Sequence, residues 1–248
     1  MLSVLHRVAS AVGAGLEGWT DWGPADGHPG QYRHDVVADD IAVEALVGAG
    51  FGVLSEESGL HHPDRRLLVV IDPVDGSSNA SRGLPWWATS LCALDNDGPL
   101  AAVVVNQATG ARYEAVRGGG ARRDGKAIVP SGVEEIGKSF IAFSGYPQSY
   151  GGWAQFRSLG AAALDLCGVA DGTLDGFVDC AVSSLRPWDY LGAILVCSEA
   201  GAEVTEAAGR ELVVREIDAH RAPVAGATKE LVADLLEMRG RWKLPPAA

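Results

Sequence analysis

The chain has few of the residues that mark secreted, membrane or nucleic-acid-binding proteins. Its four cysteines, among 248 residues, form no Cys-x-x-Cys pair, so neither a zinc site nor a disulfide framework is expected. No apolar run approaches the roughly 20 residues that a membrane span requires. Lysine and arginine total 20 against 32 acidic residues, and the net charge of −12 would repel nucleic acid. We therefore expect a cytoplasmic protein with reduced thiols, and neither a membrane nor a nucleic acid as partner.

The composition is that of an ordinary globular protein. Hydrophobic residues make up 47% and charged residues 21% of the chain, whose length allows one large domain or two joined halves. The residue pattern changes around 130–137: strand patterns precede this segment, and small residues at helical spacing follow it. We place a boundary there, between an N-terminal α+β half over 1–132 and a C-terminal α/β half over 133–248.

Helical and extended patterns both occur along the chain. Apolar residues at helical spacing predict helices, and short β-branched runs bounded by turn residues predict strands. The Asp72-Pro73 pair is expected to end the strand before it, because proline has no N–H to donate. The predicted helices cover 1–18, 39–48, 158–170, 188–200 and 229–238, and the predicted extended segments cover 51–54, 67–71, 91–94, 100–105, 112–116, 139–143, 177–178, 203–205, 213–214 and 224–226.

One segment, Asp72–Asn79, combines two carboxylates with residues that make a tight turn. Asp72 and Asp75 flank a proline, and Gly76 permits a backbone conformation that other residues avoid. Such a turn directs both carboxylates toward one point, where they would repel each other unless a cation neutralised them. Hard cations such as Mg²⁺ prefer oxygen ligands of this kind. The alternative is an Asp-rich turn that only caps the next segment.

Two further acidic segments could join this one. Glu56 and Glu57 follow a predicted strand, and Asp189 follows Pro187-Trp188 at a predicted helix start. Taken alone, the first is compatible with a solvated loop, and the second with an ordinary helix cap.

In their order along the chain, the three segments resemble the signatures of the inositol monophosphatase family. The matching residues are Glu56-Glu57-Ser58, Asp72–Asn79 and Trp188–Gly192. The resemblance implies an α/β (α+β) fold, a layered αβαβα sandwich of the inositol monophosphatase and fructose-1,6-bisphosphatase type. In that fold the N-terminal half carries most of the metal ligands, and the C-terminal half supplies Asp189 and the substrate wall.

The resemblance also implies residue roles. Glu56, Asp72, Asp75, Asp189 and the carbonyl of Val74 would hold two or three Mg²⁺ ions. The catalytic residues would be Glu56, Asp72, Asp75 and Ser77, with Ser77 helping to orient the attacking water. Gly76, Ser77 and Ser78 would contact the phosphate, while Asp179 and Asp189 would contact the rest of the substrate.

The expected activity is Mg²⁺-dependent hydrolysis of a small phosphate ester, such as inositol monophosphate or a related sugar or polyol phosphate. Lithium sensitivity and a homodimer are expected from the resemblance as well. Segment 33–40 departs from the family's pattern, which leaves the third metal site open. The alternatives are a 3′(2′),5′-bisphosphate nucleotidase, a histidinol-phosphatase and a catalytically impaired regulatory relative.

Overall fold

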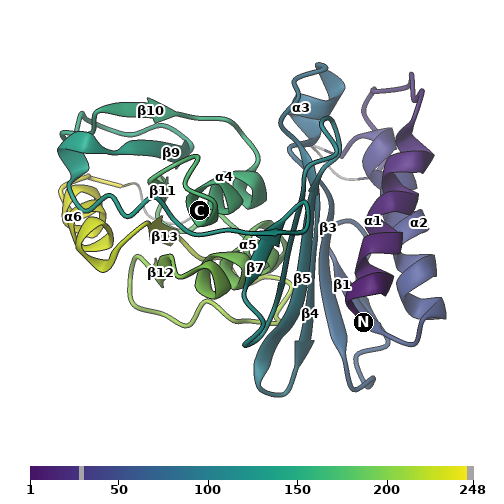
Figure 1. The fold of residues 1–248 in the computed structure, drawn as a ribbon. Helices are drawn as coiled ribbons and strands as arrows, with labels where there is room; N and C mark the ends of the chain where they lie inside the picture. Colours follow the sequence, from purple (N-terminus) through teal and green to yellow (C-terminus); the bar gives the residue numbers. More distant parts are fainter. Residues whose placement is uncertain (28–30, 245–248) are drawn as a thin grey trace.

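The computed structural model describes residues 1–27 and 31–244. Two β-sheets enclose the helices α4 (Ala162–Ala170) and α5 (Pro187–Ala200), as Figure 1 shows. Helices α1 (Leu2–Leu16) and α2 (Arg33–Gly48) cover the outer face of the first sheet, and α6 (Lys229–Gly240) covers that of the second. The layers therefore follow the order αβαβα, which confirms the predicted fold class.

The first sheet has eight strands in the order β2-β1-β3-β4-β5-β6-β7-β8, and β1 and β3 are its parallel neighbours. The second has five strands in the order β10-β9-β11-β13-β12. A short helix, α3 (Ser77–Ser81), follows β3, and a 3-10 turn covers Ile136–Lys138. The strands are β1 (Gly52–Ser55), β2 (Gly59–His61), β3 (Leu68–Asp75), β4 (Ala88–Asp95), β5 (Gly98–Asn106), β6 (Arg112–Val116), β7 (Ala121–Arg123), β8 (Lys126–Ala127), β9 (Phe140–Ser144), β10 (Gln155–Arg157), β11 (Gly176–Asp179), β12 (Glu203–Glu206) and β13 (Pro223–Gly226).

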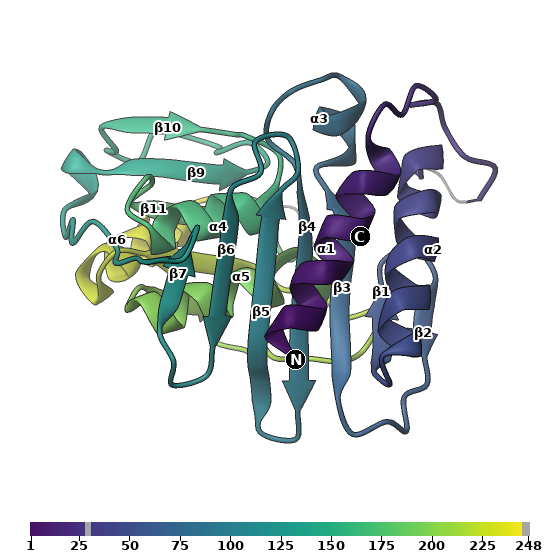
Figure 2. The same cartoon turned by 45° about the vertical axis from the view of Figure 1, so that its right-hand side comes forward.

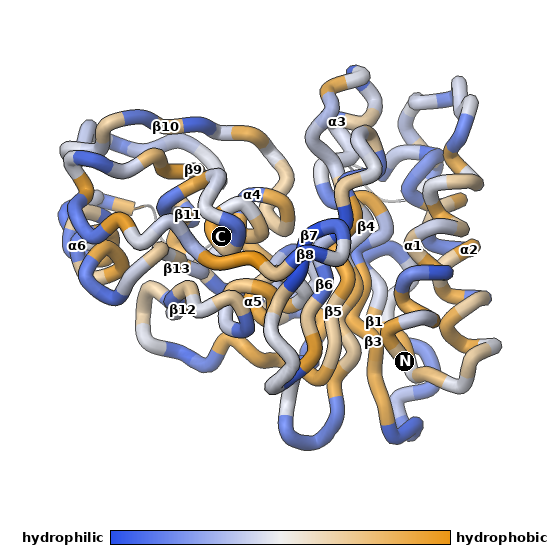
Figure 3. Tube along the Cα trace, viewed as in Figure 1, coloured by the Kyte–Doolittle hydropathy of each residue, from blue (hydrophilic) through white to orange (hydrophobic). Residues whose placement is uncertain are grey.

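The central strands are buried on both faces, which explains their continuous apolar runs. In β3, Val69 and Ile71 pack against α1 and α2, whereas Leu68 and Val70 pack toward α4 and α5. This alternation follows from the two-residue period of a strand. Figure 3 shows that the strands of the first sheet are hydrophobic and the turns between them are polar. Figure 2 shows α1 lying across these strands.

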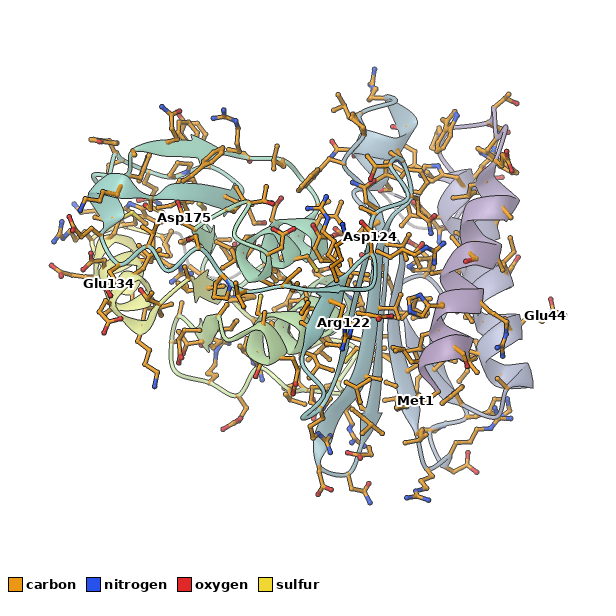
Figure 4. The ribbon with its side chains drawn as sticks, viewed as in Figure 1. Met1, Glu44, Arg122, Asp124, Glu134 and Asp175 are labelled. Atoms are coloured by element: carbon orange, nitrogen blue, oxygen red, sulfur yellow. The ribbon has the colours of Figure 1, made fainter. Side chains whose placement is uncertain are left out.

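Glu44 is exposed on α2 and points away from the first sheet (Figure 4). In the described part of the chain, no helix is both long and apolar enough to cross a membrane.

Two predicted boundaries near the acidic segments were wrong. Strand β3 does not end at Asp72-Pro73 but continues to Asp75, because its register with β4 shifts between Asp72 and Asp75 and thereby accommodates the proline. The Thr89 hydroxyl donates to the Pro73 carbonyl over 2.9 Å at this irregularity. Helix α2 begins at Arg33 rather than at 39, because the Asp35 carboxylate accepts the Tyr32 N–H and caps the first turn.

Other differences have similar local causes. Helix α4 begins at Ala162 rather than at 158, since Gly160 has a positive φ of 82° that a right-handed helix excludes. The extended segment predicted over 213–214 is not a strand. It lies in an irregular connection whose polar contacts include Arg215 donating to the Asp95 carbonyl. The prediction missed α3 and the strands β2, β7, β8 and β10, which are only two to five residues long.

The predicted boundary at 132/133 lies in the connection between the two sheets. Asp175, labelled in Figure 4, holds this connection in place: its carboxylate accepts the Ser131 hydroxyl and the Phe140 N–H. Helix α5, which follows that boundary in the chain, packs against strands of the first sheet. The division into two halves stays a prediction.

Gly192 determines how closely α5 approaches the first sheet. A Cβ at this position would lie 2.9 Å from the Ser90 hydroxyl and 3.3 Å from the Leu91 carbonyl oxygen. We predict that Gly192→Ala lowers the free energy of unfolding by about 1–3 kcal/mol through overpacking, although alanine is the better helix former. Urea unfolding measures the change.

The matched control is Gly48→Ala, a second helical glycine at which a Cβ would meet nothing within 4 Å. This variant should be neutral or stabilised by up to about 1 kcal/mol. Equal effects of the two substitutions would show that packing at Gly192 is unimportant.

Candidate active site

Three of the predicted acidic residues meet at the junction of β1, β3 and α5. Glu56 directly follows β1, and its N–H donates to the Ile71 carbonyl of the neighbouring parallel strand over 3.3 Å. This bond places Glu56 beside Asp72, which is 2% exposed. Asp189 reaches the same point from the first turn of α5. One carboxylate oxygen from each of these three residues lies within 4.8 Å of the others.

Asp75 lies beside this cluster but directs its carboxylate toward α4. It accepts the N–H groups of Ala162 and Ala163, at 3.2 and 2.8 Å. Asp189 has a similar second contact, since it accepts the Arg186 N–H over 2.7 Å and thereby caps α5. Both residues therefore act as helix caps in the structure, and a carboxylate so engaged still has acceptor sites left.

Val74 lies in the irregular stretch of β3. Its N–H donates to the Asp72 carboxylate over 2.9 Å, which forms a tight local turn. Pro73 and Val74 fall between the positions of β3 that pair with β4. A polar chain supports this stretch from the side of α1: Gln107 donates to both the Ala9 carbonyl and the Thr89 hydroxyl at 2.8 Å.

Burial and mutual repulsion raise the pKa values of the clustered acids. Desolvation, with Glu57 nearby, raises the pKa of Glu56 to about 7. Desolvation raises the pKa of Asp75 to about 8, although the Ala163 N–H opposes the shift. The pKa values of Asp72 and Asp189 lie well above the usual range, because desolvation adds to the charge of Glu56.

The donor set fits a hard divalent cation. Two like charges 4 Å apart repel by about 4 kcal/mol at an effective dielectric constant near 20, whereas a helix cap contributes only about 0.5–2 kcal/mol. Caps alone therefore cannot hold several ionised carboxylates together, so protons or a cation must neutralise them. The cluster offers only oxygen ligands, which suits Mg²⁺ better than softer metals.

The turn after Asp75 leads into α3. Gly76 has a positive φ of 86°, and a Cβ there would lie 3.1 Å from the Gly160 carbonyl, so both conformation and space favour glycine. Ser77 is partly buried at the start of α3, and the hydroxyl of the exposed Ser78 lies 3.5 Å from the Tyr32 hydroxyl. The first N–H groups of a helix have no partner within it and can bind an anion.

Asp179 lies apart from this arrangement. Its carboxylate is fully buried and accepts the Ala181 N–H, the Ser184 N–H and the Ser184 hydroxyl. It thus stabilises the loop after β11. Its contact with substrate stays a prediction.

The sequence reasoning missed Asp165, a carboxylate close to the cluster. Asp165 is 1% exposed on α4, where desolvation raises its pKa to about 7, and it accepts the Trp86 indole N–H over 2.8 Å. The available signal was an acid within a nine-residue helix that is otherwise free of charged residues.

Segment 33–40 also approaches the cluster. The negative charge of Asp35 contributes to the raised pKa of Glu56, and Asp39 accepts the hydroxyl of Ser55, the residue before Glu56. Asp40 is exposed and faces a separate surface cavity shared with His61 and His62. Arg33 instead forms an exposed ion pair with Asp21, in which Nη1 lies 2.6 Å from Oδ2.

Comparisons with known proteins agree with this geometry. The sequence model of the inositol monophosphatase family matches residues 34–240. A fructose-1,6-bisphosphatase/inositol-1-monophosphatase of Archaeoglobus fulgidus is 35% identical over 209 residues, which cover 82% of this chain and 81% of that protein. Nus factor SuhB of Escherichia coli is 32% identical over 173 residues, 63% of each chain.

The fold has a similar counterpart among solved structures. A hypothetical protein from Pyrococcus horikoshii, with similarities to inositol-1 monophosphatase, superposes with a TM-score of 0.85 at 25% identity. The superposition covers 96% of this chain and 99% of that one.

The raised pKa values predict that the metal-free protein loses stability as pH rises. The clustered carboxyls hold protons in the folded state that the unfolded chain releases near pH 4, and this stabilisation disappears as pH passes about 7 for Glu56 and about 8 for Asp75. In excess EDTA, the melting temperature should fall by several degrees between pH 5 and 8, since one pKa unit corresponds to about 1.4 kcal/mol.

Thermal unfolding at each pH measures this effect. Asp75→Asn, which removes one titrating group, should make the dependence shallower, and added Mg²⁺ should raise the melting temperature most at pH 8. A melting temperature in EDTA that does not change over this range would contradict the prediction.

Proposed function

Because the chain belongs to the inositol monophosphatase family, we propose that it is a Mg²⁺-dependent phosphomonoesterase that hydrolyses a small-metabolite phosphate. Inositol monophosphate and related sugar or polyol phosphates are the proposed substrates. The observation that carries the proposal is the convergence of Glu56, Asp72 and Asp189 from three separate segments. An acidic protein needs such a cation site to attract an anionic ester.

The proposed ligands of two or three Mg²⁺ ions are Glu56, Asp72, Asp75, Asp189 and the carbonyl of Val74. When bound, the cations neutralise phosphate charge and make water a better nucleophile. The irregular stretch of β3 supports this role, since it places Val74 outside the regular pairing with β4.

The protein groups then position the reactants. Backbone N–H groups of Gly76, Ser77 and Ser78 hold the phosphate at the start of α3. Glu56 and the Ser77 hydroxyl orient a water for in-line attack on phosphorus, and the Glu56 carboxylate accepts its proton. The bond between phosphorus and the ester oxygen breaks, and a proton from water converts the leaving alkoxide into the alcohol. Asp179 and Asp189 are the proposed contacts to the rest of the substrate. No covalent phosphoenzyme is required.

A catalytically impaired regulatory relative is the second candidate. One observation favours it, because a relative of comparable identity is named Nus factor SuhB. The residues described above neither favour nor oppose the histidinol-phosphatase alternative, which stays open.

A bisphosphate nucleotidase has less support. It would need cations for a second phosphate. Arg157, Arg186 and Lys229 are absent from the described residues that line the cavity beside Asp75 and Asp189, although the charge of Arg186 acts on both Glu56 and Asp189. The homodimer and the cytoplasmic location also stay predictions.

Asp75→Asn tests the metal assignment. The change is nearly isosteric, so the fold should survive. The value of kcat/KM for Mg²⁺-dependent phosphate release should drop by roughly 100-fold or more, since even residues that only support metal ligands cost 10–100-fold. Phosphate release from inositol 1-phosphate measures the activity, and circular dichroism checks the fold.

The control is Asp64→Asn, the same substitution at an exposed acid outside the cluster. This variant should keep wild-type turnover. Full activity of Asp75→Asn would remove Asp75 from the metal site. The absence of phosphate release by wild-type protein from any ester, with Mg²⁺ present, would favour the regulatory alternative.

Lithium provides a separate test. We predict from the family that Li⁺ inhibits Mg²⁺-dependent phosphate release, whereas Na⁺ at the same ionic strength does not. Equal responses to the two salts would indicate a screening effect rather than binding at the site.

A further inference from the structure

A small cavity of about 190 Å³ opens beside Asp75 and Asp189. It lies between the end of β9, the start of α4 and the segment that precedes α5. If the metal centre is as proposed above, the alcohol part of the phosphate ester would occupy this cavity. Its volume is below the 300–1,000 Å³ of typical drug-sized sites, so it suits a small leaving group. The remaining lining residues are Ser144, Gly145, Gly160, Ala161, Ala162, Asp165 and Leu185.

Asp165 is the carboxylate in this lining that has no place in the proposed metal centre. Trp86 donates its indole N–H to one oxygen over 2.8 Å and is the only hydrogen-bond partner of Asp165 within residues 1–27 and 31–244. A carboxylate can accept about four hydrogen bonds, so Asp165 has unused acceptor capacity although it is 1% exposed. A buried polar group with unused capacity gains from a ligand that supplies a donor.

The rest of the lining suits a polar but uncharged or cationic group. The Ser144 hydroxyl has no hydrogen-bond partner among the described residues and can either donate or accept. Leu185 and the alanines at the start of α4 provide apolar walls. The described lining contains no lysine or arginine. Arg186, which follows Leu185, directs its guanidinium to His220 and the Ile217 carbonyl.

Asp179, the acid expected from the family resemblance to contact substrate hydroxyls, is occupied elsewhere. Its oxygens accept three donors from Ala181 and Ser184, and it is absent from the cavity lining. Of these two acids, Asp165 is the one that lines the cavity.

We propose that Asp165 recognises a hydrogen-bond donor, either a hydroxyl or an ammonium group, on the leaving alcohol of the substrate. Asp165 would thereby favour phosphate esters whose leaving alcohol carries such a donor over simple alkyl phosphates. This inference rests on the proposed phosphatase function and adds a specificity-determining residue to it.

Two matched pairs of esters test the proposal. Glycerol 1-phosphate is compared with propyl phosphate, and 2-aminoethyl phosphate with ethyl phosphate, by kcat/KM in the presence of Mg²⁺. The wild-type protein should prefer the donor-bearing member of at least one pair by about tenfold or more, because hydrogen bonds to charged groups are strong.

Asp165→Asn should abolish a preference for the ammonium-bearing ester and reduce a preference for the hydroxyl-bearing ester, while it changes kcat/KM for the alkyl esters by less than about threefold. The Asn oxygen can keep the Trp86 bond, so its NH₂ group would face the cavity. A hydroxyl can turn to accept from this NH₂, but an ammonium cannot, so the larger loss identifies which donor the site uses.

Trp86→Phe is the control, since it removes the indole donor and leaves the carboxylate. It should retain the preference ratio. An unchanged ratio in Asp165→Asn, an equal loss for all four esters, or a loss of preference in Asp179→Asn alone would overturn the assignment.

Binding separates this inference from the proposed function. If no ester is hydrolysed, the proposed function fails. The affinities of the same four esters in the presence of Mg²⁺, measured by calorimetry, would still show whether Asp165 recognises the donor group. Tighter binding of a donor-bearing ester that disappears in Asp165→Asn would support it, and equal affinities within each pair would overturn it.

Discussion

Coulomb repulsion among Glu56, Asp72, Asp75 and Asp189 is the interaction on which the candidate site depends. These acids come from different parts of the chain and lie where the first sheet meets the helices between the sheets. The raised pKa values of the group favour protonation of these acids in the metal-free state. A cation would replace those protons, which makes the state of the cluster responsive to both pH and metal.

The same acids also stabilise the local fold. Asp75 caps α4, Asp189 caps α5, and Asp72 accepts the N–H of Val74. Because Asp72, Asp75 and Asp189 each have such an anchor, their positions are determined before any ligand binds. The sequence left two interpretations open for these acids, a helix cap and a cation site. In the structure the same residues act as caps and are also placed to bind a cation.

Glycines and a strand irregularity provide the room that this arrangement needs. The register shift in β3 keeps Asp72 and Asp75 in one strand despite the proline between them. Gly76 lets the chain turn tightly against Gly160, and Gly192 lets α5 lie against β4. Each position tolerates little added volume, so the junction between the layers is closely packed around the acids. This packing leaves only a small cavity beside Asp75, which restricts the size of the group that can lie there.

Much of the architecture followed from local patterns in the sequence. Apolar residues at helical spacing predicted α1, because a helix that covers a sheet buries one of its faces. A continuous run of apolar residues predicted β3, because this strand is buried on both faces. The acidic segments and their order indicated the family and predicted that Glu56, Asp72, Asp75 and Asp189 converge. Glu56, Asp72 and Asp189 form the cluster, and Asp75 lies beside it with its carboxylate directed toward α4. Boundaries were less predictable: the start of α2 depends on the Asp35 cap, and the length of β3 on its register with β4.

Only the tertiary structure decided which polar groups face the cavity. Asp165 and Asp179 look alike in the sequence as acids in apolar surroundings, yet one lines the cavity and the other stabilises a loop. Residue type and spacing determine what a side chain can bind and which strand or helix carries it. Its direction and remaining hydrogen-bonding capacity depend on contacts between residues far apart in the chain, such as Trp86 with Asp165, which local patterns do not encode.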